Sequence, residues 1–225
     1  MKAIVCVKQV PDTQGKVAVK ADGTMDRSAM ATITNPDDLN AVEAALQLKD
    51  ETGCEVVVVT MGPPPAEGML RELMARGADR GVLVSGREFG GSDTFATSQI
   101  LAAAVNKIGV GPEDIVFCGR QAIDGDTAQV GPQIAEQLKI PQVSYAEQLD
   151  VDGDSVVVKR QYEDQSHMLK VKMPCLVTAL SELTEPRYMH AGGIVDAYNK
   201  EITVWGFDDL KDDLNPEWIG LKGSP

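Results

Sequence analysis

Short apolar runs alternate with helix-like segments over the first two thirds of the chain. The runs that predict buried strands are residues 3–7, 55–60, 81–84 and 114–118. Continuous runs rich in Val and Ile are typical of parallel strands that are covered on both faces. Strands that alternate with helices indicate crossover units. The sequence therefore predicts an α/β fold, with a mostly parallel twisted sheet and helices on both faces.

Four helices are expected between and after these strands. The first begins at Asn35, a capping residue that is followed by a proline and two carboxylates, and it ends at Gly53. The others are residues 66–76, 93–108 and 127–138. Ser92 is expected to cap the helix of residues 93–108. A polar, hairpin-like excursion with its turn at Asp22-Gly23 is expected between the first strand and the first helix.

The pattern changes after residue 141. Residues 143–151, 155–161 and 167–172 alternate apolar and polar side chains, which predicts antiparallel strands, and residues 175–180 form a further strand. After residue 182 the periodicity is poor. The acidic tail from Asp208 carries few apolar residues, so we expect it to hang free or to lie on a partner subunit.

Charge and composition exclude several classes of protein. The 225 residues include 34 acidic and 21 basic side chains, for a formal net charge of -13. This balance argues against nucleic-acid binding, because a phosphate backbone is met by clustered Lys and Arg. There is no signal-peptide core and no apolar run near the roughly 18 residues that cross a bilayer, so we expect a cytoplasmic protein without membrane insertion. Four widely spaced cysteines without a C-x-x-C pair predict buried free thiols and no metal site.

Candidate chemistry gathers at one edge of the predicted sheet. Ligands of open α/β sheets bind beyond the carboxyl ends of the strands, where residues 6–12, 61–65, 86–97 and 119–129 are expected. The last segment places two glycines in an extended loop before a helix start, which offers backbone N–H groups to a phosphate. It matches neither a Walker A nor a G-x-G-x-x-G pattern. On spacing alone, a nucleotide site and an ordinary capped loop are equally supported.

Several polar side chains near this loop have two interpretations. Asp124 and Asp126 repel a phosphate unless they point away, and Asp126 with Gln129 resembles a capping box that leaves the loop amides free. Thr94, Thr97 and Ser98 lie in the first turns of a helix. Hydroxyls there bond a ligand or fold back onto their own backbone, and the second role is the more common.

The chain shows few groups that perform catalysis. It has no serine elbow and no metal-spaced cluster, and its two histidines lie away from the sheet edge. Cys6, at a strand end, is interpreted as a buried small side chain rather than a nucleophile. No catalytic residue and no metal ligand is predicted, so any reaction would have to be supplied by a cofactor.

The chain resembles the beta subunit of electron transfer flavoprotein over nearly its whole length. The matching stretches are VCVKQVPD, NPDDLNAVEAAL, VVTMGPP, MARGADRGVLV, GRQAIDGDTAQVGPQIAEQL and VTALSELTEPRY. The resemblance implies an adenine-nucleotide alpha hydrolase-like fold, a flavin-carrying alpha subunit as partner, and electron exchange with an acyl-CoA dehydrogenase or a similar flavoenzyme. It also implies that residues 1–182 bind a nucleotide, and that residues 183–225 form a recognition loop and an arm on the partner subunit.

The resemblance places the nucleotide contacts by position. They are Cys6 through its backbone, Asn35, Asp37, Asp38, Met61, Gly119, Arg120, Gln121, Ala122, Ile123, Asp124, Gly125, Asp126, Thr127, Ala128, Gln129 and Val130. Three of these four segments are also indicated by the residues alone, whereas Asn35 reads as a helix cap.

The segment REFGGSDTFATS resembles the electron-bifurcating branch of the family, in which a second FAD replaces AMP. This resemblance implies that the isoalloxazine extends toward Thr94 and Thr97 and toward Pro11 and Asp12. NADH is expected near Met61, Gly62 and the glycines at 90 and 91. Its electrons would go to ferredoxin and, through the alpha-subunit FAD, to the dehydrogenase.

Two alternatives stay open. One is a non-bifurcating beta subunit that holds structural AMP and acts as a scaffold and docking module; the other is a free, monomeric adenine-nucleotide sensor. Residues 188–193 correspond to the recognition loop for the dehydrogenase, but no leucine stands near Ala191 at the anchor position. A glycine-rich connector without partner contacts is the other interpretation of this loop.

Overall fold

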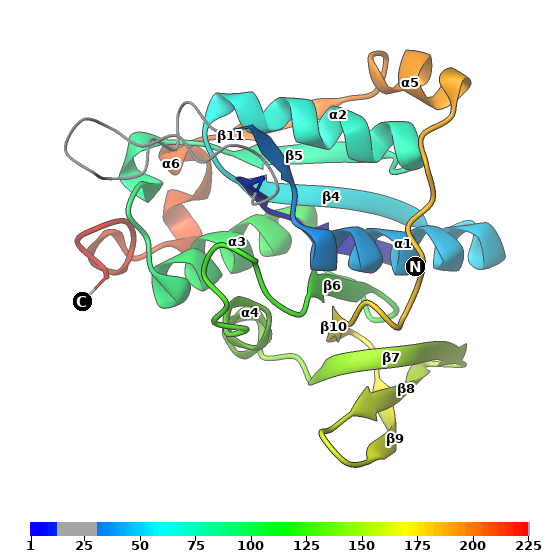
Figure 1. Cartoon of the computed structure of the whole chain (residues 1–225). Helices are drawn as coiled ribbons and strands as arrows, with labels where there is room; N and C mark the ends of the chain where they lie inside the picture. Colours follow the sequence, from blue (N-terminus) through cyan, green and yellow to red (C-terminus); the bar gives the residue numbers. More distant parts are fainter. Residues whose placement is uncertain (13–30, 225) are drawn as a thin grey trace.

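The computed structural model describes residues 1–12 and 31–224. Within them, nine strands form one sheet in the order β11-β5-β4-β1-β6-β10-β7-β8-β9 (Figure 1). The strands are β1 (Lys2–Cys6), β4 (Glu55–Met61), β5 (Arg80–Val84), β6 (Ile115–Gly119), β7 (Gln142–Asp152), β8 (Ser155–Gln161), β9 (Ser166–Lys172), β10 (Cys175–Ala179) and β11 (Ile202–Trp205).

Most of this sheet is parallel. All neighbours from β11 to β7 pair in parallel, and β8 and β9 continue the sheet as antiparallel strands beyond β7. Figure 1 shows β8 and β9 at one end of the sheet, with α2 and α5 near the other. The α/β class and the antiparallel extension are therefore confirmed.

Helices cover both faces of the sheet. They are α1 (Pro36–Thr52), α2 (Glu67–Arg76), α3 (Thr94–Ile108), α4 (Val130–Leu138), α5 (Ala191–Ala197) and α6 (Phe207–Leu210). Side chains of α1 and α2 pack in one apolar layer, and those of α3, α4 and α6 pack in the other. The run Val56–Val59 is fully buried and contributes to both layers, as its continuous apolar pattern predicts.

The segment after residue 183 is more regular than its sequence suggests. Helix α5 packs on α2, and β11 pairs in parallel with β5 at the edge of the sheet. The tail also folds back: the Leu221 N–H donates to the Gly90 carbonyl at 3.1 Å, and the Gly220 N–H donates to Ser92 Oγ at 3.0 Å. The described tail thus packs against its own domain instead of hanging free. Its contact with a partner subunit stays a prediction.

Two short strands flank the excursion that was expected before α1. β2 (Gln9–Pro11) and β3 (Thr32–Thr34) pair in antiparallel fashion as a separate ribbon. The expected turn at Asp22-Gly23 lies outside the described residues. No helix in the described part of the chain is both long enough and apolar enough to cross a membrane.

Candidate nucleotide site

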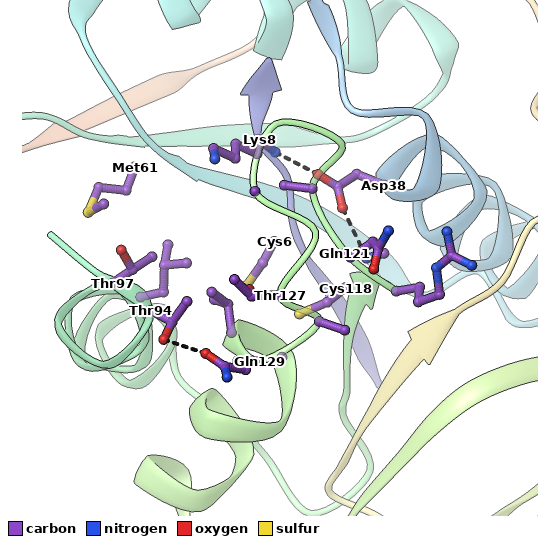
Figure 2. Close-up of a pocket in the computed structure, with 18 of the residues that line it drawn as sticks. Cys6, Lys8, Asp38, Met61, Thr94, Thr97, Cys118, Gln121, Thr127 and Gln129 are labelled. Atoms are coloured by element: carbon purple, nitrogen blue, oxygen red, sulfur yellow. Dashed lines mark hydrogen bonds between the residues drawn. The ribbon is translucent and has the colours of Figure 1, made fainter. Parts of the chain in front are cut away.

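A cavity of about 330 Å³ opens at the carboxyl edge of the sheet. It lies beyond the ends of β1, β4 and β6 and beside the first turns of α3 and α4 (Figure 2). All four segments that the sequence places at this edge contribute to its wall, through residues 6–8, Met61, residues 92–94 with Thr97, and residues 119–122 and 125–131. Segments far apart in the sequence therefore meet at one point.

The longest part of the wall is the segment of residues 119–130, here called the 119–130 loop. It leaves β6 at Gly119, and two of its residues, Asp126 and Ala128, have left-handed backbone with φ of 53°. Left-handed residues that alternate with others are the backbone pattern of anion-binding nests. Helix α4 follows at Val130, and its free N-terminal amides are the positive end of the helix dipole.

The predicted capping box at the start of α4 is wrong. Asp126 Oδ1 accepts a hydrogen bond from Gln121 Nε2 at 2.8 Å, and the helix starts at Val130 rather than at residue 127. The left-handed backbone of Ala128 cannot be part of a right-handed helix, which moves the start. Gln129 occupies the N-cap position without a capping bond, and its Oε1 instead accepts from the Thr94 hydroxyl at 2.9 Å.

A buried carboxylate, Asp38, joins two strand ends at the cavity wall. Its Oδ2 accepts from the Lys8 N–H at 2.8 Å, just beyond β1, and its Oδ1 accepts from the Gly119 N–H at 3.0 Å, at the end of β6. Burial raises the pKa of Asp38 to about 7, although hydrogen bonds from Asn35, Lys8 and Gly119 act in the opposite direction. Asp38 thus fixes the backbone on both sides of the cavity floor.

Asn35 holds the 119–130 loop instead of capping α1. Its Nδ2 donates to the Gln121 carbonyl at 2.8 Å, and its Oδ1 accepts from the Ile123 N–H at 3.1 Å. The side chain makes no capping bond and does not line the cavity. The expected cap is therefore wrong, because two backbone groups of the loop occupy both ends of the amide.

Helix α3 is capped by Asp93 rather than by Ser92. The Asp93 carboxylate accepts from the Ala96 N–H at 2.9 Å. The Ser92 hydroxyl instead donates to the Phe89 carbonyl at 2.8 Å, which stabilises the turn before the helix.

The three hydroxyls in the first turns of α3 have different surroundings. Thr94 and Thr97 line the cavity. Ser98 is fully buried and folds back onto its own helix, where it donates to the Phe95 carbonyl at 2.7 Å. Two of the three hydroxyls are therefore placed to meet a ligand.

Two ion pairs offset part of the negative charge near the cavity. Lys8 Nζ lies 2.7 Å from Asp124 Oδ1, and Arg120 Nε lies 3.2 Å from Asp37 Oδ2. Lys8 and Arg120 themselves line the cavity, whereas Asp37 and Asp124 do not. The expected conflict with a phosphate is thereby reduced for Asp124, whereas Asp126 lines the cavity and accepts its hydrogen bond from the uncharged Gln121 amide.

The structure brings most of the predicted contact residues to the cavity. Those that line it are Cys6, Asp38, Met61, Thr94, Thr97, Gly119, Arg120, Gln121, Ala122, Gly125, Asp126, Thr127, Ala128, Gln129 and Val130. Those that do not line it are Pro11, Asp12, Asn35, Asp37, Gly62, Ile123 and Asp124. Lining residues that the prediction missed are Val7, Lys8, Ser92, Asp93, Leu101, Cys118 and Gly131. Adjacency to the predicted segments was the signal for all of these except Leu101.

The four cysteines are free and buried, as predicted. Burial raises the pKa of the Cys175 thiol to about 11, so that this group stays protonated near neutral pH. Within residues 1–12 and 31–224, no group of three or more His, Cys, Asp and Glu side chains could hold a metal ion.

An exposed apolar feature lies on α5 and beside its two ends. Tyr188, Ile194, Val195 and Tyr198 expose 92%, 43%, 65% and 74% of their surface, and we call them the α5 patch. Its position is fixed by Arg187, whose Nε lies 2.9 Å from Oε2 of the buried Glu43 on α1. The segment corresponding to the expected recognition loop is thus exposed but anchored.

The fold and the cavity define the class: an α/β domain with a ligand site at the carboxyl edge of a mostly parallel sheet. Comparison with known proteins gives the family. The model of the "Electron transfer flavoprotein domain" matches residues 22–210. The chain belongs to the electron transfer flavoprotein family, as its sequence motifs indicated.

Three relatives each align over 100% of this chain and 85% of their own length. The chain is 60% identical to the "Acryloyl-CoA reductase electron transfer subunit gamma" of Anaerotignum propionicum. It is 52% identical to the "Caffeyl-CoA reductase-Etf complex subunit CarD" of Acetobacterium woodii. It is 50% identical to the "Electron transfer flavoprotein subunit beta" of Clostridium acetobutylicum. Two of these relatives are thus named as parts of CoA-ester reductase systems.

Proposed function

We propose that this chain is the FAD-binding beta subunit of an electron-bifurcating flavoprotein that oxidises NADH. The observation that carries the proposal is the convergence of the 119–130 loop, the α4 N-terminus and the hydroxyls of Thr94 and Thr97 on one cavity. A site for a mononucleotide needs the first two, and the hydroxyls on the facing helix are suited to a larger ligand. The names of the relatives in acryloyl-CoA and caffeyl-CoA reductase systems support the same assignment.

The residues present fit a dinucleotide. Free amides of α4 and the nest-like backbone at Asp126 and Ala128 suit its phosphates. The cations Lys8 and Arg120 stand at the rim, with 49% and 42% of their side chains exposed. The cavity volume of about 330 Å³ lies within the range of about 300–1,000 Å³ that small-molecule sites occupy; the rest of a dinucleotide would reach past the rim.

The cofactor would supply the chemistry and the chain would position it. A flavin accepts a hydride from a nicotinamide and passes electrons on singly. The residues of this chain would bind the phosphates at α4 and orient the ring system beside Thr94 and Thr97. Asp38 and Asn35 would keep the loop in place, through their bonds to Gly119, Gln121 and Ile123.

The partners follow from the same proposal. The chain would pair with a flavin-carrying alpha subunit in the cytoplasm. One electron of each NADH pair would go to ferredoxin and the other, through the alpha-subunit FAD, to an acyl-CoA dehydrogenase or a related CoA-ester reductase. We assign docking of that flavoenzyme to the α5 patch. Its side chains Tyr188 and Tyr198 are largely exposed, and aromatic side chains are enriched in protein interfaces.

Structural AMP is the second candidate ligand. The Thr94 hydroxyl already donates to Gln129 at 2.9 Å, so it has a partner without a flavin. An adenylate needs only the 119–130 loop and the α4 amides. In that case the chain would be a scaffold and docking module rather than a redox subunit.

Counting cofactors separates the two candidates. The chain is co-purified with its alpha subunit, the complex is denatured, and the released FAD and AMP are quantified by chromatography. We expect two FAD and no AMP per heterodimer. Anaerobic NADH titration should bleach both flavins, and ferredoxin should be reduced only when the CoA-ester acceptor is present. One FAD plus one AMP would overturn the proposal in favour of the scaffold.

A further inference from the structure

Two of the four thiols lie side by side on the cavity floor. Cys6 and Cys118 are direct register partners on the adjacent parallel strands β1 and β6. Neighbouring strands lie about 4.8 Å apart, and residues in register point to the same face of a sheet. Both side chains belong to the apolar layer under α3 and α4, both are 6% exposed, and both line the cavity (Figure 2). One small ligand can therefore contact both sulfurs.

The two thiols also interact with each other. Hydrogen bonding with Cys6 is the largest cause that raises the pKa of Cys118 well above its usual value, and burial is the next. The nearby carboxylate of Asp38 acts in the same direction. The Cys118 thiol is therefore protonated at neutral pH and is a poor nucleophile. A metal ion that binds its sulfur as a thiolate has to displace this proton.

The donor set restricts which ligand this can be. Within the described residues no third His, Cys, Asp or Glu joins the pair in a metal-ligating group. Zinc takes four ligands in structural sites and three protein ligands in catalytic ones, so two thiolates do not suit it. Soft thiolates select Cu(I), zinc and iron–sulfur clusters, and among these Cu(I) accepts two thiolates as its whole ligand set. Metal binding releases the thiol protons. Cys54 and Cys175 lie in the opposite apolar layer and serve as internal controls.

We propose that Cys6 and Cys118 form a dithiolate site for a soft monovalent metal ion, Cu(I), on the floor of the cavity. Two S–H bonds lose their protons to solvent and two Cu–S bonds form, and the oxidation state of copper does not change. A bound ion would lie under the 119–130 loop, so that metal and nucleotide would compete. The metal site does not depend on the proposed function, whereas the competition requires a nucleotide in this cavity.

Cu(I) titration of the full chain tests the site. Under anaerobic conditions the chain competes with a chromophoric Cu(I) chelator of known affinity. We expect one Cu(I) per chain in the wild type and in the double variant Cys54→Ala/Cys175→Ala. Binding should be at least tenfold weaker in Cys6→Ala and in Cys118→Ala. Equal affinity in either of these single variants and in the wild type, or no binding in the wild type, would overturn the proposal.

Two further measurements do not depend on how the variants fold. X-ray absorption of the Cu(I)-loaded wild type should show sulfur-only coordination by two ligands, and a nitrogen- or oxygen-dominated shell would overturn the assignment. Preloading the chain with AMP or FAD should lower Cu(I) uptake. Undiminished uptake with the nucleotide retained would overturn the competition while leaving the dithiolate site in place.

Discussion

Asp38 couples the stability of the cavity wall to pH. Burial raises its pKa from the ordinary 3.8 to about 7. Between these pH values the folded chain binds a proton that the unfolded chain has lost, so the free energy of unfolding falls as pH rises from about 4 to 7. Each pH unit in this window lowers the free energy of unfolding by at most about 1.4 kcal/mol. We expect the Asp38→Asn variant to lose this pH-dependent part of the stability.

Urea unfolding at several pH values measures the effect. Between pH 5 and pH 7, the free energy of unfolding of the Asp38→Asn variant should rise by about 1–3 kcal/mol relative to that of the wild type. Above pH 8 the two plots of unfolding free energy against pH should run parallel. Asp37→Asn is the matched control, because it retains Asp38 and both of its amide donors. The Asp37 charge is the smallest of the causes that act on the pKa of Asp38, so this variant should keep most of the slope. Parallel wild-type and Asp38→Asn profiles below pH 7 would contradict the assignment.

The hydroxyls of Thr94 and Thr97 should contribute to FAD affinity. Both line the cavity, and Val replaces each hydroxyl by a methyl group of similar size. Loss of one hydrogen bond of about 1 kcal/mol corresponds to roughly fivefold weaker binding. We expect this loss for Thr94→Val and Thr97→Val, measured by fluorescence titration of the stripped complex with FAD. Thr94→Ser and Thr97→Ser keep the hydroxyl and should bind like the wild type. Val variants with wild-type affinity would remove both residues from the site.

At the scale of elements, β6 approaches the first turn of α1 closely at Gly119. A Cβ atom there would lie 2.6 Å from the backbone nitrogen of Asp38, a separation that real Cβ atoms do not show. We expect Gly119→Ala to lower the free energy of unfolding by about 2 kcal/mol through overpacking, and to weaken nucleotide binding. Gly125→Ala in the same loop is the control, since its Cβ would meet nothing within 4 Å. Equal melting temperatures of the two variants would argue against the close approach.

A second contact between elements fixes the α5 patch. Arg187 pairs with the buried Glu43 and, at 2.8 Å, with Asp50 at the exposed side of α1. Arg187→Ala leaves the buried Glu43 carboxylate without its cation. We expect the free energy of unfolding in urea to fall by about 2 kcal/mol. The value is moderate because a third of the Arg187 side chain is exposed to solvent. Lys170→Ala removes an exposed pair with Asp152 and should leave the unfolding midpoint unchanged. Similar midpoints for both variants would show that the Glu43 pair does not stabilise the fold.

These contacts show which features the sequence could predict. Strands β4 and β8 were predicted nearly to the residue, because burial imposes a local apolar pattern on them. Strand β11 was missed, since its half-exposed residues owe their conformation to pairing with β5. The edge of the sheet that holds the cavity was also predicted, because crossover units make the strands parallel and bring their carboxyl ends together. Asn35 could not be assigned, because its partners lie 86 and 88 residues away in the chain.

At the scale of the whole molecule, the proposed cofactor site and the proposed docking surface lie on different parts of the chain. The cavity lies at the carboxyl edge between α3 and α4, whereas the α5 patch lies over α2 (Figure 1). Variants on one surface should therefore leave the function of the other intact. We expect Tyr188→Ala/Tyr198→Ala to retain wild-type FAD content, because neither side chain lines the cavity.

The same double variant should lose affinity for the acceptor flavoenzyme. Truncation of two exposed aromatic anchors that become buried on docking costs about 2 kcal/mol or more, which is roughly a thirtyfold higher concentration for half-maximal electron transfer. Steady-state rates measured against increasing flavoprotein concentration check this, with flavin content determined on the same samples. Met168→Ala, at a 61% exposed position on β9, is the matched control and should behave like the wild type. If the tyrosine variant transfers electrons with an unchanged concentration dependence, the acceptor docks elsewhere.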